Sequence, residues 1–409
     1  MTDFELRLLE PHEIDAYAAC QASAFSSRYP ADRLDALAKE LDLERSLAVF
    51  DGTDLVATSS SFSAQMTLPG LARCNVAAVT DVAVVPTHRR RGLLNSLMRR
   101  QLDDLHTNGD AIAVLYASEG AIYGRYGYGP ASFGANYQVD KRLCRLLSPL
   151  RAGTGSVRLL ESGQAAEAFP LVFASYVLTR PGEVERPQGE WAEVLCDVSA
   201  SAMGHRFYAC YEEAGRIDGY AVYRVAGIDP TDHWRRGVFL EELCTLSDDA
   251  YIALWGFLLG VDLTEDLRTA GRPVDEPIRY LFEDQRQLRT TRWTDRSWLR
   301  LVDVPRALSL RGYEAEGALV IDVGDSFCPW NEGRFALTVD SSGAGVVEAS
   351  RASADLVVPA EVLGSAYLGA VSFRALAEVG RIEECTNGAA GSADAMFRAA
   401  RPPFCTTHF

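Results

Sequence analysis

The chain has 409 residues, 48% of them hydrophobic and 23% charged, with a formal net charge of −16. This length exceeds what one hydrophobic core supports, so we expect two or three domains. The negative charge argues against nucleic acid as a partner and favours cationic substrates. The nine cysteines are scattered singly, which predicts neither a disulfide framework nor a metal site and is typical of a reducing cytoplasm. We find no apolar run of membrane-spanning length and no basic signal-peptide start, so we expect a cytoplasmic protein without a membrane partner.

The first part of the chain predicts a strand and two helices followed by a sheet. The Asp51-Gly52 pair separates two short apolar runs, 47–50 and 55–58, and is a strong hairpin signal. We expect a separate strand over residues 61–68 and, after a Pro-Gly turn, a further strand that leads into the most informative stretch of the chain.

That stretch combines a strand, a basic turn and a helix. Valines between 79 and 85 predict a strand that Pro86 ends, and leucines from 93 to 105 recur at helical spacing. The turn holds three arginines, 89–91, followed by Gly92. A helix N-terminus offers unpaired N–H groups, glycine admits a close approach, and arginines form forked contacts with phosphate, so the turn predicts a phosphate site. A surface helix that simply begins with arginines would give the same pattern.

The turn lacks the lysine and serine or threonine of a P-loop and the three spaced glycines of a dinucleotide site. It resembles the acetyl-CoA signature of the GCN5-related N-acetyltransferase (GNAT) superfamily, Gln/Arg-x-x-Gly-x-Gly/Ala. Here the signature reads Arg-Arg-Arg-Gly-Leu-Leu, with Leu94 where a small residue is usual. The resemblance implies that the next strand, 112–116, diverges from the valine-rich strand. It also implies that the pantetheine arm of acetyl-CoA pairs with backbone exposed in the gap.

Four glycines and three tyrosines follow within residues 117–130, which predicts a tight, irregular segment. A tyrosine can protonate the CoA thiolate that leaves during acetyl transfer. By composition alone, Tyr123, Tyr126 and Tyr128 are all candidates, and packing is the ordinary role of most tyrosines. The full run, Ser-Glu-Gly-x-Ile-Tyr-Gly-Arg-Tyr-Gly-Tyr-Gly-Pro-Ala, resembles the enhanced intracellular survival (Eis) family of bacterial N-acetyltransferases.

The Eis resemblance implies an acetyl-CoA-dependent N-acetyltransferase in which Tyr123 is the general acid. A backbone N–H near Val84 would hold the oxyanion. The CoA contacts that the resemblance implies are Val82, Ala83, Val84, Arg90, Arg91, Gly92, Leu93, Leu94, Asn95, Ser118 and Glu119.

The next region repeats the same order of elements. Helical runs precede a hairpin predicted to turn at Asp218-Gly219, and a strand over 238–246 leads into a helix capped by Ser247–Asp249. Acidic residues thus replace the arginines, and a negative turn repels phosphate, so we do not expect this region to bind CoA. We interpret it as a scaffold, with a wall of the substrate pocket as the alternative. Eis proteins are similar in having a second, degenerate acetyltransferase region.

Beyond residue 301 the pattern changes again. Strands over 318–323 and 334–339 and a helix over 360–367 resemble the sterol-carrier-like domain that ends Eis proteins, although the fold alone does not imply lipid binding. We therefore expect an α/β (α+β) protein with two tandem GNAT-like regions and a sterol-carrier-protein-like C-terminal domain, and a linker at 148–156. The expected boundaries are 1–150 for the catalytic domain, 151–300 for the degenerate domain and 301–409 for the sterol-carrier-like domain.

The last residues form an unusual tail. A helix over 392–401 is predicted to stop at two prolines, and the phenylalanines at 404 and 409 can anchor an end that would otherwise fray. The Eis resemblance implies that the terminal carboxylate, here that of Phe409, is the general base in the active site. An α-carboxyl group has a pKa of about 3.5 and is ionised at neutral pH. His408 is the alternative base, or shares the role.

Together these features predict acetyl transfer from acetyl-CoA to primary amines without a metal. The resemblance implies polycationic substrates of the aminoglycoside type, modified at more than one position, and a homohexamer built as a trimer of dimers. One alternative is a lysine acetyltransferase that acts on a protein or peptide. Another is a non-catalytic CoA- or lipid-binding module, against which the intact Arg90, Gly92 and Tyr123 argue.

Overall fold

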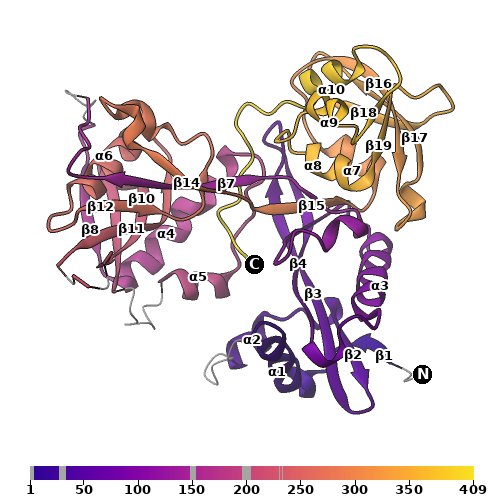
Figure 1. Ribbon diagram of the computed structural model, residues 1–409, viewed down its shortest axis with the longest axis horizontal. Helices are drawn as coiled ribbons and strands as arrows, with labels where there is room; N and C mark the ends of the chain where they lie inside the picture. Colours follow the sequence, from indigo (N-terminus) through magenta and orange to yellow (C-terminus); the bar gives the residue numbers. More distant parts are fainter. Residues whose placement is uncertain (1–3, 27–33, 148–152, 196–203, 230, 233) are drawn as a thin grey trace. The chain divides into compact units, whose positions relative to one another are not determined.

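The protein is shown in Figure 1 as a computed structural model. The structure describes residues 4–26, 34–147, 153–195, 204–229, 231–232 and 234–409. Its internal contacts divide the chain into two units that are interleaved in the sequence. The first unit combines Met1–Ser132 with Arg296–Phe409, and the second unit is Phe133–Asp295.

The first unit contains a mixed sheet in the order β1-β2-β3-β4-β5-β15-β6. Its strands are β1 (Glu5–Leu8), β2 (Ser46–Asp51), β3 (Asp54–Thr67), β4 (Arg73–Val84), β5 (Ile112–Tyr116), β15 (Ser297–Leu301) and β6 (Gly129–Pro130). Although β15 comes late in the chain, it lies between β5 and β6, and Figure 1 shows this orange strand among purple ones. The hairpin predicted at Asp51-Gly52 is confirmed by the pairing of β2 with β3.

The expectation of separate strands over 55–58 and 61–68 is wrong, because β3 is continuous. Serines 59–61 lie where the break was expected. In the structure Ser59 and Ser60 are buried within the sheet, and the hydroxyls of Ser60 and Ser46 form a hydrogen bond of 2.8 Å across β2 and β3. Burial of the Ser60 side chain is tolerated because its hydrogen bond is made inside the protein.

Helices pack on this sheet and position the basic turn. They are α1 (Ile14–Ala24), α2 (Leu34–Glu40) and α3 (Leu93–Thr107). The apolar spacing predicted for α3 is confirmed, because Met98 and all its leucines except the half-buried Leu94 are buried. Leu93 and Leu97 join a core cluster with β2 and β3, whereas Met98, Leu102 and Leu105 join a second cluster with β4 and β5.

The C-terminal part of the first unit is a smaller sheet covered by short helices. The sheet order is β18-β17-β16-β19-β20. The elements are α7 (Val304–Leu310), β16 (Gly317–Gly324), β17 (Gly333–Val339), β18 (Gly345–Ala349), β19 (Leu356–Pro359), α8 (Ala360–Ala366), α9 (Phe373–Glu378), β20 (Glu383–Glu384) and α10 (Ala389–Phe397). The helix predicted over 392–401 therefore ends four residues early, where Arg398 adopts an extended backbone with ψ 145°.

The second unit contains a sheet in the order β13-β7-β12-β11-β10-β9-β8, with β14 also pairing with β7. Its strands are β7 (Phe133–Asp140), β8 (Ser156–Leu160), β9 (Arg206–Glu213), β10 (Arg216–Gly227), β11 (Arg236–Thr245), β12 (Asp266–Thr269), β13 (Arg272–Pro273) and β14 (Arg289–Asp295). The helices are α4 (Ser162–Tyr176), α5 (Gln188–Leu195) and α6 (Asp248–Gly260). The predicted cap of α6 is confirmed, because the Ser247 hydroxyl accepts a hydrogen bond of 3.2 Å from the N–H of Ala250.

The hairpin predicted to turn at Asp218-Gly219 turns instead at Ala214-Gly215, whose φ angles are 50° and 80°. Positive φ at both central residues suits a two-residue hairpin turn. Asp218 is buried and pairs with Arg216. Gly219 lies inside β10, where a methyl group would meet the side chain of Thr245 at 3.0 Å. The Asp-Gly pair therefore marks a close approach between strands and not a turn.

Two strands bear on the expected domain boundaries. Strand β7 precedes residue 150 but belongs to the sheet of the second unit. Strand β15 begins before the expected boundary at 300 but belongs to the sheet of the first unit. Part of the predicted linker, residues 148–152, lies outside the described residues. The three-domain division stays a prediction. Among the helices that the structure describes, none has the length and apolarity needed to cross a bilayer.

Candidate active site

The basic turn forms an open cradle at the start of α3. Gly92 is the N-cap residue with φ +86°, and a side-chain methyl there would meet nothing within 4 Å. Arg90 also has a positive φ, 64°. Glycine at this position keeps the first N–H groups of the helix reachable for an anion, as a phosphate-binding helix start requires.

The arginines of the turn divide into two roles. The Arg89 guanidinium donates a hydrogen bond of 3.1 Å to the Ala24 carbonyl at the end of α1, which ties the turn to the neighbouring helix. Arg90 and Arg91 are exposed, and among the described residues neither has a hydrogen bond or an acidic partner. Both are therefore available for an anionic ligand.

The strands beside the turn diverge as predicted. Parallel pairing of β4 with β5 runs from Ala77 opposite Ala113 to Val79 opposite Leu115. Beyond Val79, β4 has a bulge and pairs with β3 alone among the described strands, up to Val84. On the side that faces β5, β4 therefore has no partner among the described strands over residues 80–84, which include the predicted CoA contacts Val82, Ala83 and Val84. The Val84 carbonyl oxygen accepts a hydrogen bond of 3.4 Å from the Arg89 side chain instead.

The bulge centres on Asp81, a residue that the sequence analysis missed. Asp81 has φ +56°, and its carboxylate accepts a hydrogen bond of 2.9 Å from the hydroxyl of Tyr17. Its carbonyl oxygen accepts hydrogen bonds from Gln21 and Thr58 at 2.7 and 2.8 Å. Burial raises the pKa of the Asp81 carboxyl, and the hydrogen bond from Tyr17 opposes that rise. The available signal was an acid inside a valine-rich strand.

Tyr123 begins the 3₁₀ turn η5 (Tyr123–Tyr126), which follows β5. Its side chain is only 5% exposed, and its hydroxyl has no hydrogen-bond partner among the described residues. Burial raises the pKa of Tyr123 to about 12, with smaller contributions from Tyr126 and Glu119. Tyr123 therefore keeps its proton at neutral pH and has no internal acceptor for it, as a proton donor to a ligand requires.

The other two tyrosines of this segment are packing residues. The Tyr126 ring meets Phe327 edge to face at 5.0 Å, and Tyr128 is fully buried, 6.1 Å from the Tyr123 ring. Ser118 and Glu119 are exposed at the start of the same segment.

The remaining predicted contacts lie in the first turn of α3. Leu93 is buried and Leu94 packs against the core, so only their backbone groups face the cradle, whereas Asn95 is exposed. The polar groups that this turn offers a ligand are therefore main-chain N–H groups and the side chain of Asn95.

The C-terminal tail is held against the end of β5. The hydroxyl of Tyr116, the last residue of β5, donates hydrogen bonds to the carbonyl oxygens of Thr407 at 2.5 Å and Cys405 at 3.3 Å. Arg296 donates a hydrogen bond of 3.1 Å to the same Cys405 oxygen. Phe404 is buried beside the Arg296 guanidinium. The anchoring role predicted for the phenylalanines is thus confirmed for Phe404, and Tyr116 and Arg296 are anchors that the sequence analysis missed.

Phe409 itself lies at this strand end. Its ring meets Phe62 of β3 edge to face at 5.7 Å and Tyr116 at 5.3 Å. His408 is exposed, with its ring 4.3 Å from that of Tyr116. Since Tyr116 follows the last residue of β5 that pairs with β4, the chain terminus lies where the two strands part.

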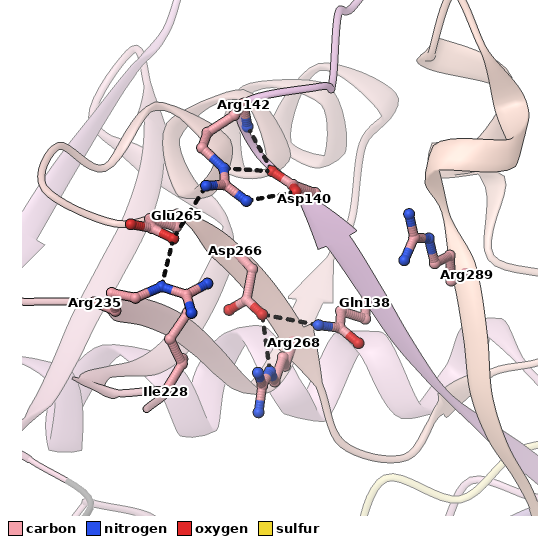
Figure 2. Close-up of a pocket in the computed structure, with 9 residues that line it drawn as sticks. All are labelled: Gln138, Asp140, Arg142, Ile228, Arg235, Glu265, Asp266, Arg268 and Arg289. Carbon is pink, nitrogen blue, oxygen red and sulfur yellow. Dashed lines mark hydrogen bonds and ion pairs between the residues drawn. The ribbon is translucent and has the colours of Figure 1, made fainter. Parts of the chain in front are cut away.

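The second unit holds a polar cavity of about 260 Å³, shown in Figure 2. It is lined by Gln138, Asp140, Arg142, Ile228, Arg235, Glu265, Asp266, Arg268 and Arg289. Arg142 pairs with Asp140 at 2.9 Å, Arg235 with Glu265 at 3.0 Å and Arg268 with Asp266 at 3.0 Å. Because its carboxylates already face guanidinium groups, this cavity is not an acidic site for a cation, and it contains none of the predicted site residues.

No cluster of three or more His, Cys, Asp and Glu side chains suited to a metal is found among the described residues.

Family models cover most of the chain. Acetyltransferase (GNAT) domain models match residues 5–131 and 182–301, and a sterol carrier protein domain model matches residues 304–406. The predicted fold class is therefore confirmed: an α/β protein with two GNAT regions followed by a sterol-carrier-like domain.

Individual proteins agree with these matches. An uncharacterized N-acetyltransferase of Streptomyces coelicolor is 39% identical over 402 residues, 96% of each chain. The N-acetyltransferase Eis of Mycobacterium tuberculosis is 36% identical over 338 residues, 81% of this chain and 80% of that protein. The crystal structure of Eis1 from Mycobacterium abscessus superimposes with a TM-score of 0.88 at 32% identity, covering 99% of this chain and all of that one.

Proposed function

Because this chain belongs to the Eis family of GCN5-related N-acetyltransferases, we propose that it acetylates primary amines of a polycationic small molecule of the aminoglycoside type, at more than one position. The observation that carries the proposal is the tail, whose last residues are held where β4 and β5 part, at the strand end that leads into the Tyr123 turn. The net charge of −16 favours a cationic substrate.

Acetyl-CoA is the co-substrate of GNAT domains, and the residues of the cradle suit it. We assign its phosphates to the N–H groups of residues 92–95 together with Arg90 and Arg91, which are exposed and have no acidic partner within the described part of the chain. Its pantetheine amides would pair with the open edge of β4 at Val82–Val84, and Ser118 and Glu119 would complete the contacts from the end of β5.

The proposed chemistry needs one proton acceptor and one proton donor. The carboxylate of Phe409 takes a proton from the substrate ammonium group, and the neutral amine attacks the acetyl carbonyl carbon. A backbone N–H near Val84 stabilises the oxyanion. The C–S bond then breaks, and Tyr123 gives its proton to the departing thiolate. The nitrogen still carries one extra proton after the attack and passes it to the Tyr123 phenolate as the amide forms, and the Phe409 carboxyl releases the first proton to solvent. His408 is the competing acceptor, but it is exposed beside Tyr116.

A thiol-release assay with acetyl-CoA tests the function. We expect turnover with an aminoglycoside that carries four or more amines, and mass spectrometry should show more than one added acetyl group per molecule. A sugar of the same size without amines is the matched control. Turnover with lysine peptides but not with aminoglycosides would replace this proposal by a protein lysine acetyltransferase. No turnover with either would favour a CoA- or lipid-binding module.

We further propose a cytoplasmic homohexamer, arranged as a trimer of dimers, with domain boundaries at 150 and 300. The absence of disulfides among the described cysteines is compatible with a reducing compartment. Light scattering coupled to size-exclusion chromatography measures the assembly, and a mass of six chains is the expected result.

A further inference from the structure

One loop of the sterol-carrier-like domain contacts both halves of the predicted site. The loop spans 325–331 and ends in the 3₁₀ turn η9 (Pro329–Asn331). Its Phe327 ring lies 3.8 Å from the guanidinium carbon of Arg99 on α3, the helix that starts at the cradle. On another side the same ring packs against Tyr126 in η5, the turn that carries Tyr123. The loop thus bridges the proposed CoA helix and the proposed acid turn.

A buried ion pair connects this loop to the core sheet. Arg300, on β15, is fully buried and pairs through Nη2 with Asp325, whose side chain is 2% exposed. Asp325 is itself fixed, because it accepts hydrogen bonds from the N–H of Cys328 at 3.0 Å and from the Asn331 amide at 3.2 Å. The acid is therefore a rigid anchor for the arginine.

The other face of Arg300 touches the acid turn. Nε and Nη1 of Arg300 are buried and have no hydrogen-bond acceptor among the described residues. They lie against Gly127, where an added methyl group would come within 2.5 Å of the guanidinium carbon. Gly127 closes η5 with φ +81°, and its N–H donates a hydrogen bond of 3.0 Å to Gly124. The guanidinium of Arg300 thus packs directly against Gly127, the residue that ends the turn.

Stability alone gives little reason for an ion pair at this place. Replacing a buried pair by apolar residues of similar volume is often neutral or stabilising, because the desolvation of both charges offsets their attraction. The position of the turn is a different matter. A guanidinium that a carboxylate holds by a hydrogen bond has a fixed place against Gly127, whereas an aliphatic side chain can change rotamer.

We propose that Arg300 and Asp325 are positioning residues for acetyl transfer, which hold the η5 turn so that the Tyr123 hydroxyl points at the departing thiolate. The proposal rests on the assignment of Tyr123 as proton donor. In this proposal the sterol-carrier-like domain contributes to acetyl transfer, since Asp325 belongs to that domain and holds, through Arg300, a turn of the catalytic region.

Arg311 provides a matched control. It is also buried in the first unit, at 2% exposure, and donates hydrogen bonds to the carbonyl oxygens of Phe397, at 2.9 Å, and Tyr367. Its guanidinium packs on Tyr313 and Phe397, within the sterol-carrier-like domain and not against η5. Arg311→Lys therefore removes an equally buried guanidinium without touching the turn.

The experiment compares Arg300→Lys, Asp325→Asn and Arg311→Lys by melting temperature, kcat and KM for acetyl-CoA, well below the melting point of each variant. We expect both pair variants to lose roughly tenfold to hundredfold in kcat, with KM changed less than threefold, because a displaced catalytic group costs about that much. Arg311→Lys should lose melting temperature and keep kcat. The double replacement Arg300→Met with Asp325→Asn removes both charges and keeps an acceptor for the Cys328 N–H, so it should be more stable than Arg300→Met alone and still show the low kcat.

A combination with Tyr123→Phe separates the possible outcomes. If Arg300 acts through Tyr123, Arg300→Lys adds no further loss in a Tyr123→Phe background. If the kcat losses of Arg300→Lys and Tyr123→Phe multiply in the double variant, the positioning role is overturned while the proposed function stands. The same holds if Arg300→Lys is as active as Arg311→Lys. A Tyr123→Phe enzyme with the original kcat overturns the acid assignment, and the positioning role with it.

Discussion

The hydroxyl of Tyr116 and the carbonyl oxygen of Thr407 lie 2.5 Å apart, although 291 positions separate the two residues in the sequence. This hydrogen bond fixes the end of the chain to the strand end beside the proposed acetyl site. Chain termini usually fray. Here Tyr116 and Arg296 donate hydrogen bonds to backbone carbonyl oxygens of the tail, and the rings of Tyr116 and Phe62 contact the ring of Phe409.

Tyr116→Phe should loosen this tail without disturbing β5, whose backbone pairing does not use the hydroxyl. A single hydrogen bond contributes about 0.5–1.5 kcal/mol, so we expect kcat to fall roughly twofold to tenfold. Carboxypeptidase should also release Phe409 faster from the variant. Unchanged release of Phe409 would show that the aromatic contacts hold the tail by themselves.

Chemistry at the Phe409 carboxylate depends on where the chain ends and not on which side chain ends it. A C-terminal extension converts the carboxylate to an amide, and deletion of Phe409 moves the charge back by one residue. Both variants should fold, bind acetyl-CoA and lose roughly 10²-fold or more in kcat, with partial rescue at high pH as the substrate amine deprotonates.

His408→Ala is the control for the tail and should keep much of its activity. Full activity in the extended enzyme would return His408 as the base. Loss in all three variants would mean that the tail positions the substrate as a unit.

The cradle at Gly92 predicts a difference between neighbouring substitutions. Gly92→Asp places a negative side chain where a phosphate should lie, so KM for acetyl-CoA should rise more than in Arg90→Ala. For Arg90→Ala we expect a cost of about 1.5–3 kcal/mol, or roughly 10- to 100-fold in KM. Arg100→Ala is the matched control, since Arg100 is exposed on the same helix but pairs with Asp104 at 2.9 Å. An unchanged KM in Gly92→Asp would exclude the phosphate site.

Tyr123→Phe keeps the ring and removes the proton, so we expect the fold to persist while kcat falls roughly 10²–10⁴-fold. Tyr126→Phe should remain active. Because burial raises the pKa of Tyr123 to about 12, the donor stays protonated from pH 7 to 10, and kcat of the unaltered enzyme should not decline on the alkaline side over that range. An alkaline loss of kcat near pH 8 would indicate a different acid.

The raised pKa of Tyr123 also makes the free energy of unfolding depend on pH. Its pKa in the folded state lies above that of the unfolded chain, about 10, so its contribution is fully present below pH 10 and is lost as pH rises toward 12. In Tyr123→Phe the free energy of unfolding should therefore fall less steeply between pH 10 and 12. Chemical denaturation at several pH values measures this slope.

Asp81 gives a prediction of the same sign at lower pH. Burial raises the pKa of its carboxyl, so the ionised form destabilises the fold, and this cost grows as pH rises through the folded-state pKa. Asp81→Asn keeps an acceptor for the Tyr17 hydroxyl and removes the charge. We expect a higher melting temperature at pH 7 and a smaller difference from the original protein near pH 4. A lower melting temperature at pH 7 would show that the carboxylate is stabilised where it lies.

The sequence predicts the local structure around the candidate site well where the signals are local. The arginine turn, the start of α3 at Leu93 and the limits of β5 follow from spacing, since each depends on neighbouring residues. The partners of the tail do not follow, because Tyr116 and Arg296 resemble any other tyrosine and arginine until the sheet brings them to one place. The bulge at Asp81 was not predicted for a similar reason, since residue types alone do not indicate a positive φ at a non-glycine residue.

The prediction of one hairpin turn from its Asp-Gly pair was wrong. Asp218-Gly219 has the stronger signal, but Ala214-Gly215 makes the turn, because register across β9, β10 and β11 fixes which glycine lies at the end and which faces Thr245. Similarly, the place of β15 inside the first sheet is a long-range property. Its sequence reads as a strand, and nothing local assigns it to one unit or the other.

That placement of β15 has a consequence for synthesis on the ribosome. Strand β15 pairs with β5 along its whole length, from Ser297 opposite Tyr116 to Leu301 opposite Ile112, and Trp298 packs into the core around Tyr123. A nascent chain that has emerged only through the first GNAT region therefore exposes an unpaired edge of β5 and an unfilled core. The first sheet can be completed only after Leu301 has left the exit tunnel. The second unit, residues 133–295, is therefore synthesised, and is able to fold, before the first sheet has all its strands.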